Sequence, residues 1–185
     1  MKAITDDIIY GRTALREGLP WITPGAITYL NTIIKPSWRV FEWGSGGSSV
    51  YFVSHCAEYV AIEHDANWIT RTRDLLTKRG FDPYVVNLVK PDPDGEHHAY
   101  ADAILDFPDN SFDLISVDGE ATSRKWCIPN CMPKIKPGGW LMLDNSNWYE
   151  DVTGWQRQDF IVRNLHWVGQ ADPFDWWTSF FQKPE

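Results

Sequence analysis

The sequence of 185 residues is long enough for one domain with a well-buried core, so we expect a single domain over residues 1–185. Its formal net charge of −8 disfavours nucleic acids and anionic membranes as main partners, because both attract cationic protein surfaces. The chain has no apolar run of membrane-spanning length, no signal-peptide pattern at its start and only 3 cysteines, so we expect a cytoplasmic protein without a disulfide framework.

The first predicted elements lead up to a glycine-rich loop. Residues 1–20 show no clear periodicity, and we expect them to form a lid over a ligand or an interface with a neighbouring molecule. Thr23 followed by Pro24 predicts the start of a helix. Residues 39–43, with three large apolar side chains, then predict a strand, and residues 48–57 predict the helix that follows the loop.

The loop between this strand and this helix reads Glu-Trp-Gly-Ser-Gly-Gly-Ser over residues 42–48. Glycines without a Cβ atom let the backbone approach a ligand closely, and the free N–H groups at a helix start bind polar groups. We expect the carboxylate of Glu42 to face the same crevice and to bind a cationic amine. A dinucleotide-binding loop instead requires a third small residue, Gly or Ala, where this chain has Ser49. The pattern therefore favours a ligand that combines an amino-acid part with a nucleoside.

A second strand, predicted over residues 59–63, completes a β-α-β unit and ends in an acid. In nucleotide-binding folds an acid at this position accepts hydrogen bonds from ribose hydroxyls, so we expect Glu63 to bind the ribose. His64 follows directly and is expected near the ligand. Trp68 lies at the start of a helix predicted over residues 66–79, and it is a candidate to cover the base of the nucleoside.

The rest of the chain continues to alternate between strands and helices. The further predicted elements are strands near residues 84–89 and 112–118, a fifth strand that ends at residue 144, helices near residues 99–105 and 124–135, and a loop over residues 90–98. Residues 147–164 are predicted as loop and helix, followed by two antiparallel strands near residues 166–170 and 177–182. This order predicts a three-layer α/β/α sandwich with a Rossmann-like, mostly parallel, seven-stranded sheet and a C-terminal antiparallel hairpin.

These motifs together resemble the class I S-adenosylmethionine-dependent methyltransferases over most of the chain. The glycine-rich loop is similar to their first motif, Glu63-His64-Asp65 to the acid after their second strand, and residues 112–119 and 136–144 to their fourth and fifth strands. Residues 19–24, and the Val-Asp-Gly before Arg124 and Cys127, are similar to a small bacterial and phage-type subgroup. The resemblance implies S-adenosylmethionine as the cofactor, and the expected cofactor-binding residues are Glu42, Gly44, Ser45, Gly46, Gly47, Ser48, Glu63, His64, Trp68 and Asp118.

Asp118 and Asp144 are the expected catalytic residues, because methyl transfer needs two positioned reactants and the removal of a proton from the acceptor. In catechol-type O-methyltransferases an acid after the fourth strand and an Asp-Asn pair after the fifth hold a magnesium ion. The resemblance therefore implies a Mg²⁺ site formed by Asp118, Asp144 and Asn145. The lysine that serves as base in those enzymes is Ala121 here. In a metal-free site, Asp118 or Asp144 orients or deprotonates a hydroxyl or an amine.

The sequence contains 11 tryptophans, an unusually high number, and part of them must belong to the core. Trp148 and Tyr149 are the best candidates for an exposed platform on which a sugar ring or a planar acceptor stacks. Arg124 is expected either to bind an acidic substrate group or to pair with Glu120. The expected substrate-binding residues are therefore Arg124, Asn145, Trp148 and Tyr149.

The function expected from these residues is S-adenosylmethionine-dependent O-methylation of a small molecule or a saccharide. The alternatives are N-methylation, a non-catalytic cofactor-binding subunit and a nicotinamide-dependent oxidoreductase. The chain is close to a bare catalytic core. We therefore expect selectivity to come from residues 1–20, from the loop after Asp144 and from a second subunit in a homo-oligomer.

Overall fold

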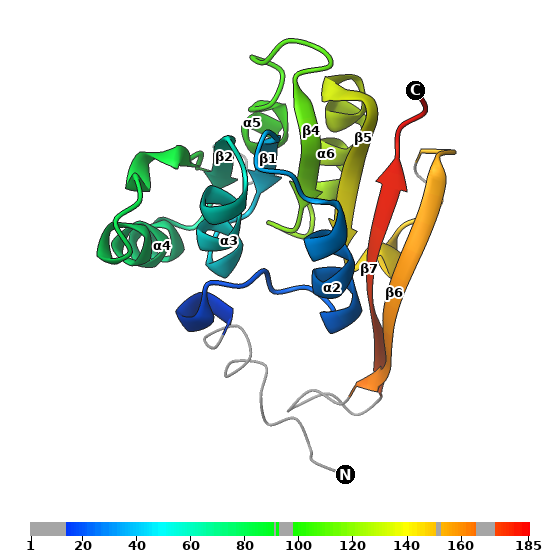
Figure 1. The fold of residues 1–185 in the computed structure, drawn as a ribbon, viewed down its shortest axis with the longest axis horizontal. Helices are drawn as coiled ribbons and strands as arrows, with labels where there is room; N and C mark the ends of the chain where they lie inside the picture. The colour runs from blue at the N-terminus through cyan, green and yellow to red at the C-terminus, as the bar shows by residue number, and fades with distance from the viewer. Residues whose placement is uncertain (1–13, 91, 93–97, 151–152, 166–172) are drawn as a thin grey trace.

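Seven strands form one sheet in the order β3-β2-β1-β4-β5-β7-β6 (Figure 1). The computed structural model describes residues 14–90, 92, 98–150, 153–165 and 173–185. The strands are β1 (Arg39–Trp43), β2 (Glu58–Glu63), β3 (Val86–Leu88), β4 (Phe112–Val117), β5 (Ile135–Asp144), β6 (Gln156–Leu165) and β7 (Phe174–Gln182). The first five strands are parallel, and β7 pairs antiparallel with both β5 and β6. The predicted fold class is therefore confirmed.

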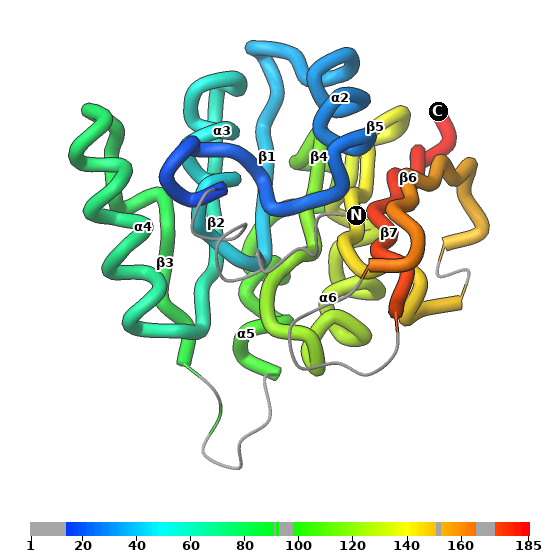
Figure 2. The backbone as a smooth tube through the Cα atoms, turned by 90° about the horizontal axis from the view of Figure 1, so that it is seen from below, coloured from blue at the N-terminus to red at the C-terminus, as the bar shows by residue number. Residues whose placement is uncertain are grey.

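Helices cover both faces of the sheet and complete the three layers (Figure 2). One face packs against α2 (Pro24–Ile33), α3 (Gly47–His55) and α4 (Ala66–Lys78), and the other against α5 (His98–Asp102) and α6 (Arg124–Cys131). Along β1, Val40 belongs to the first core layer and Phe41 to the second, so both faces of this strand are buried. None of the described helices is long and apolar enough to cross a membrane.

The prediction of loop and helix for residues 147–164 is wrong. Among the described residues of this range, the only helix is the short 3-10 helix at Ser146–Trp148, and the strand β6 begins at Gln156. β6 lies at the edge of the sheet, and most of its residues keep part of their surface in solvent. The first half of β6 is polar and has no clear alternation of apolar and polar residues, so the sequence pattern does not predict this strand. The strand predicted near residues 166–170 lies outside the described residues, and that predicted near 177–182 is part of β7.

Other element boundaries shift by a few residues. α6 ends at Cys131, and a 3-10 helix over Met132–Lys134 continues to β5. The predicted third strand starts later, because residues 83–85 form a 3-10 turn in which the Asp82 carboxylate accepts a hydrogen bond from the backbone N–H of Tyr84. The predicted loop over residues 90–98 lies mostly outside the described residues.

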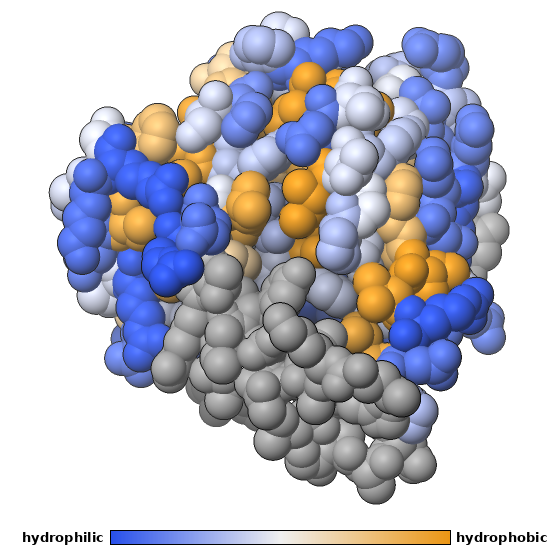
Figure 3. Space-filling view, turned by 60° about the horizontal axis from the view of Figure 1, so that its bottom comes forward, coloured by the Kyte–Doolittle hydropathy of each residue, from blue (hydrophilic) through white to orange (hydrophobic). Residues whose placement is uncertain are grey.

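The start of α2 is attached to the C-terminal hairpin. Thr23 precedes the helix as predicted, but its hydroxyl makes no capping hydrogen bond and donates to the carbonyl oxygen of Phe160 instead. The backbone N–H of Thr23 donates to Thr178 Oγ1 at 3.0 Å. These contacts bring the segment before α2, which includes Trp21, next to β7. On the coloured part of the surface in Figure 3, hydrophobic residues form separate patches among hydrophilic ones.

Candidate active site

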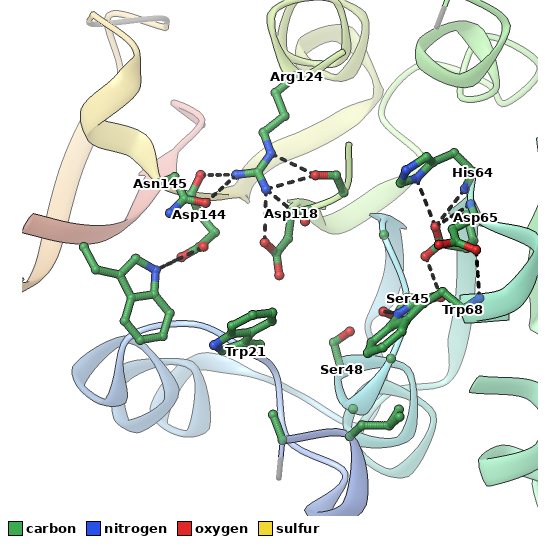
Figure 4. Close-up of a pocket in the computed structure, with 18 residues that line it drawn as sticks. Trp21, Ser45, Ser48, His64, Asp65, Trp68, Asp118, Arg124, Asp144 and Asn145 are labelled. Atoms are coloured by element: carbon green, nitrogen blue, oxygen red, sulfur yellow. Dashed lines mark hydrogen bonds and ion pairs between the residues drawn. The ribbon is translucent and has the colours of Figure 1, made fainter. Parts of the chain in front are cut away.

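A cavity of about 400 Å³ opens at the carboxyl ends of β1, β2, β4 and β5 (Figure 4). Its lining comes from the loop after β1, from the end of β2 and the start of α4, and from the ends of β4 and β5. The N-terminal segment adds Ala14, Leu15 and Trp21, and β7 adds Trp176. Sheets of this kind bind ligands at this end, so the cavity lies where the sequence predicts a site.

The polar side chains of the cavity form two groups on opposite sides (Figure 4). We call the first group the cofactor half; it comprises Ser45, Ser48, Glu63, His64, Asp65 and Trp68. We call the second group the acid half; it comprises Trp21, Asp118, Arg124, Asp144, Asn145 and Trp176. The glycines at positions 44, 46 and 47 also line the cavity.

The glycine-rich loop takes its shape from backbone conformations that favour glycine. Gly44 has φ +109° and Gly46 has φ +145°, both in the region that residues with a Cβ atom rarely adopt. Trp68 holds the loop in place, because its indole Nε1 donates to the carbonyl oxygen of Ser45 at 2.7 Å. The indole also lies 3.4 Å from where a Cβ atom on Gly46 would be. The predicted ligand loop and the predicted aromatic cover, Trp68, are thus in direct contact.

The absence of a Cβ atom on Gly47 serves a different purpose from the one predicted. A Cβ atom there would lie 2.2 Å from the carbonyl oxygen of Leu19 and 2.3 Å from that of Ala14. This glycine therefore makes room for the N-terminal segment, which packs directly on the start of α3. Ala14 and Leu15 of the predicted segment 1–20, together with Trp21 just after it, line the cavity.

Glu42 does not line the cavity, contrary to expectation. Its side chain is buried, and its carboxyl group accepts hydrogen bonds from the hydroxyls of Tyr59, Ser48 and Ser116. Burial raises the pKa of Glu42 to about 8, so the group is mostly protonated at neutral pH. A neutral acid behind the cavity wall does not bind a cationic amine directly. We therefore assign Glu42 to the support of Ser48 and of the loop.

Glu63 lines the cavity at the predicted position. Its Oε1 accepts hydrogen bonds from the backbone N–H groups of His64 and Asp65 at 2.8 and 3.0 Å. Its Oε2 accepts from Ser45 Oγ at 2.8 Å and retains room for a further donor. The hydrogen bond to Glu63 raises the pKa of His64, whose Nδ1 lies 3.0 Å from Oε1. These contacts fix the orientation of the carboxylate in the cavity wall.

Asp144 ends β5 and is held by two side chains from β7. Thr178 Oγ1 donates to its Oδ1 at 2.6 Å, and Trp176 Nε1 lies 3.0 and 3.1 Å from its two carboxyl oxygens. Burial raises the pKa of Asp144 to about 6, while the Thr178 hydrogen bond, the Arg124 charge and the Trp176 hydrogen bond oppose this shift. At neutral pH the group is therefore mostly ionised, and it takes up a proton just below neutrality.

Asp118 follows β4 and faces the same half of the cavity. Burial, and then the negative charge of Asp144, raise the pKa of Asp118 well above its ordinary value. The pair thus combines one acid whose pKa is raised strongly with another whose pKa is raised to about 6. Such a divergence between two neighbouring acids is a common arrangement for proton transfer.

Arg124 does not pair with Glu120, and its role toward a substrate stays a prediction. Arg124 is the first residue of α6, its side chain is buried, and its guanidinium donates to oxygens at the ends of β4 and β5. Glu120 instead accepts hydrogen bonds from Thr122 and Ser123. Arg124 therefore lies in the cavity wall, where its guanidinium joins the loops after β4 and β5.

The residues implied for a Mg²⁺ site do not fit a metal ion. Asn145 Oδ1 accepts a hydrogen bond from Arg124 at 3.0 Å, and Asp118 Oδ1 lies 3.4 Å from the same guanidinium. The cation between these oxygens is thus an arginine. Within the described part of the chain, no group of three or more His, Cys, Asp or Glu side chains is arranged to hold a metal.

The predicted aromatic platform lies outside the cavity. Trp148 is 56% exposed, with the Arg124 guanidinium 5.7 Å from its ring, and the hydroxyl of Tyr149 donates to the carbonyl oxygen of Ala121. The aromatic walls of the acid half are Trp21 and Trp176 instead. The sequence predicts only that one of the two adjacent tryptophans of β7 faces the core. Trp176 and Thr178 are two residues apart on one strand, so their side chains point to the same face of the sheet. This spacing is the signal from which the sequence could have predicted that both lie beside Asp144.

Comparison with known proteins is consistent with this geometry. A family described as a methyltransferase domain matches residues 41–146. The fold is similar to precorrin-8W decarboxylase from Methanobacterium thermoautotrophicum, with 17% identity, a TM-score of 0.62, and 88% of this chain and 92% of that chain covered.

Two methyltransferases share the fold as well. Precorrin-6y C5,15-methyltransferase from Geobacter metallireducens has 17% identity and a TM-score of 0.59, over 85% of this chain and 86% of that one. The O-methyltransferase TomG from Streptomyces achromogenes, solved in complex with S-adenosylmethionine, has 16% identity and a TM-score of 0.57, over 94% and 89%. A search of curated proteins finds no significant match.

Proposed function

Since the chain belongs to the methyltransferase domain family and is an S-adenosylmethionine-dependent methyltransferase, we propose that it methylates a hydroxyl group of an uncharged small molecule or saccharide. The composition of the acid half supports this acceptor class. Two carboxylic acids and two tryptophans line it, and its guanidinium donates to protein oxygens. An acidic acceptor would meet two further acids there and an arginine already engaged by the protein.

The cofactor half suits the nucleoside and amino-acid parts of S-adenosylmethionine. Glu63 is positioned to accept hydrogen bonds from ribose hydroxyls, and Trp68 offers an indole beside the loop. The start of α3 offers backbone N–H groups to a carboxylate. When bound, S-adenosylmethionine supplies a methyl group on a positively charged sulfur. The acid half borders the same cavity and is the proposed place of the acceptor.

Asp144 is the proposed base. Its Oδ2 shares the Trp176 N–H with Oδ1 and so retains room to accept the proton of an acceptor hydroxyl. Asp118 lines the same half of the cavity, and its proposed role is to orient the acceptor by a hydrogen bond. Trp21 and Trp176 provide flat apolar surfaces for a sugar ring or an aromatic ring.

The proposal is tested first by calorimetric titration and then by an acceptor screen. We expect S-adenosylmethionine and S-adenosylhomocysteine to bind and NAD not to bind. Acceptors are then compared in matched sets that differ in charge or in the accepting atom. Phenol is compared with hydroxybenzoate and with aniline, and methyl glucoside is compared with glucuronate. Formation of S-adenosylhomocysteine with the uncharged hydroxyl compounds is the expected result. Turnover of the amines alone would establish N-methylation, and turnover of the carboxylates alone would contradict the acceptor class.

Replacing Glu63 with alanine is expected to weaken S-adenosylhomocysteine binding by about 1–3 kcal/mol, because the ribose hydroxyls and the N–H groups of residues 64 and 65 lose a buried acceptor. Calorimetric titration measures the change. Glu58→Ala is the matched control, since Glu58 starts the same strand at its opposite end and has an exposed side chain. Equal affinities of the two folded variants would contradict a role for Glu63 in cofactor binding.

Replacing Trp176 with phenylalanine is expected to move the pH dependence of methyl transfer. Turnover of the wild-type protein should rise as Asp144 ionises near pH 6. The Trp176 hydrogen bond lowers this pKa, so its removal raises the pKa and shifts the rising limb to higher pH. The pH profile of kcat/KM measures the shift. Trp177→Phe on the same strand is the control, and equal profiles for both variants would contradict the role of the indole N–H.

A further inference from the structure

Arg124 connects the two loops that carry the acids. Its Nη1 donates to the backbone oxygen of Asp144 at 2.6 Å and to Asn145 Oδ1 at 3.0 Å, both after β5. Its Nη2 donates to the backbone oxygens of Asp118 and Gly119, each at 3.0 Å, and Nε lies 3.2 Å from the Gly119 oxygen. One buried guanidinium thus binds the ends of two neighbouring strands.

The atoms around this guanidinium have the chemistry of a divalent-cation site. Three are backbone oxygens, one is the side-chain oxygen of Asn145, and the fifth is Asp118 Oδ1 at 3.4 Å from Nη2. Hard cations such as Mg²⁺, Ca²⁺ and Mn²⁺ bind carbonyl and carboxylate oxygens of this kind. The planar guanidinium satisfies the same oxygens with a single positive charge and a fixed geometry.

We infer that the guanidinium of Arg124 takes the place of a divalent cation between β4 and β5, and that Arg124 is a positioning residue of a metal-independent site. The inference deepens the proposed function, because it concerns the same acids. Arg124 holds the loops after β4 and β5 at a constant separation, and so it holds Asp118 and Asp144 in place for the acceptor. The ring of Trp148 lies against the guanidinium at 5.7 Å and covers it.

Mn²⁺ binding tests this inference without any methyl acceptor, so its failure is distinguishable from a failure of the proposed function. Free Mn²⁺ is measured by its electron paramagnetic resonance signal in solutions of the purified full chain. The wild-type protein is expected to leave this signal unchanged up to about 1 mM Mn²⁺, the weak end of protein Ca²⁺ sites. Arg124→Ala exposes the five oxygens and is expected to bind Mn²⁺ on the order of tenfold more tightly than the wild type or better.

Two further variants separate a specific site from a general effect of charge. Lys125→Ala removes the neighbouring cation, whose ammonium lies against Trp126, and should bind no more Mn²⁺ than the wild type. Arg124→Ala combined with Asp118→Asn removes one of the exposed ligands and should lose the gained binding. Equal gains in the Lys125→Ala and Arg124→Ala proteins, or no gain in a folded Arg124→Ala protein, would overturn the inference.

The wild-type protein alone also tests the inference, should Arg124→Ala not fold. Its unfolding temperature is expected to be the same in excess EDTA and in millimolar Mg²⁺, since a metal that binds only the folded state would stabilise it. Wild-type Mn²⁺ binding that Asp118→Asn abolishes would show that a metal shares the site with Arg124, and it would overturn the inference.

Discussion

Replacing Asp144 with asparagine is expected to lower the rate of methyl transfer by about 10²–10⁴-fold, the usual contribution of a general base. The amide keeps the size of the side chain, and its oxygen still accepts hydrogen bonds from Thr178 Oγ1 and Trp176 Nε1, which lie 2.6 and 3.0 Å from Oδ1. It does not accept the proton of an acceptor hydroxyl. The single-turnover rate of S-adenosylhomocysteine formation, with an acceptor from the screen, measures the effect.

The same variant should bind S-adenosylhomocysteine as tightly as the wild type, because Asp144 lies in the acid half. Asp109→Asn is the matched control, since Asp109 is exposed, pairs with Lys134 and lies before the amino end of β4. Weaker cofactor binding by Asp144→Asn would show that Asp144 contributes to cofactor binding. An undiminished rate would transfer the role of base to Asp118.

Replacing Gly47 with alanine is expected to detach the N-terminal segment from α3 and to weaken cofactor binding on the order of tenfold, or about 1.4 kcal/mol. The new Cβ atom would lie 2.2 and 2.3 Å from the backbone oxygens of Leu19 and Ala14. Backbone atoms cannot rotate away as a side chain does, and overpacking of this kind costs about 1–3 kcal/mol. Ala14 and Leu15 line the cavity, so their displacement opens it to solvent.

Limited proteolysis and calorimetry measure the two consequences of Gly47→Ala. We expect faster cleavage near residues 14–21 and a larger dissociation constant for S-adenosylhomocysteine. Ser54→Ala is the control, because Ser54 lies in the same helix and its hydroxyl donates only within that helix, to the carbonyl oxygen of Val50. A lower affinity with an unchanged cleavage pattern would place the defect in the glycine-rich loop and would contradict a covering role for the N-terminal segment.

Local sequence patterns were sufficient to predict the fold and the position of the cavity. Apolar strands that end in acids, separated by helices of suitable length, specify a parallel sheet and the end at which it binds ligands. The strand over residues 39–43 has the predicted bounds, and α3 and α4 lie within about two residues of theirs. The structure also brings Ser45, Glu63 and Trp68 together in one cavity. All three lie on the predicted β-α-β unit or at the start of the helix that follows it, so they are close in the chain as well.

The roles of individual polar side chains did not follow from the same patterns. Glu42 occupies the expected strand end, but the hydroxyls of Tyr59 and Ser116, from β2 and β4, surround it and keep it away from the cavity. The edge strand β6 was also missed, because its pairing with β7 depends on a neighbour rather than on its own periodicity. In each case the deciding contact comes from another element.

The sequence by itself determined the fold class and the strand ends at which the acids lie, since hydrophobic periodicity records which faces are buried. The family was indicated by the resemblance of its motifs. Only the tertiary structure decided which polar groups meet. Trp176 reaches Asp144 across 32 residues, and Arg124 reaches the end of β5 across 20. Burial requires that such groups be satisfied, but periodicity does not name their partners, because a hydrogen bond depends on distance and direction in the folded chain.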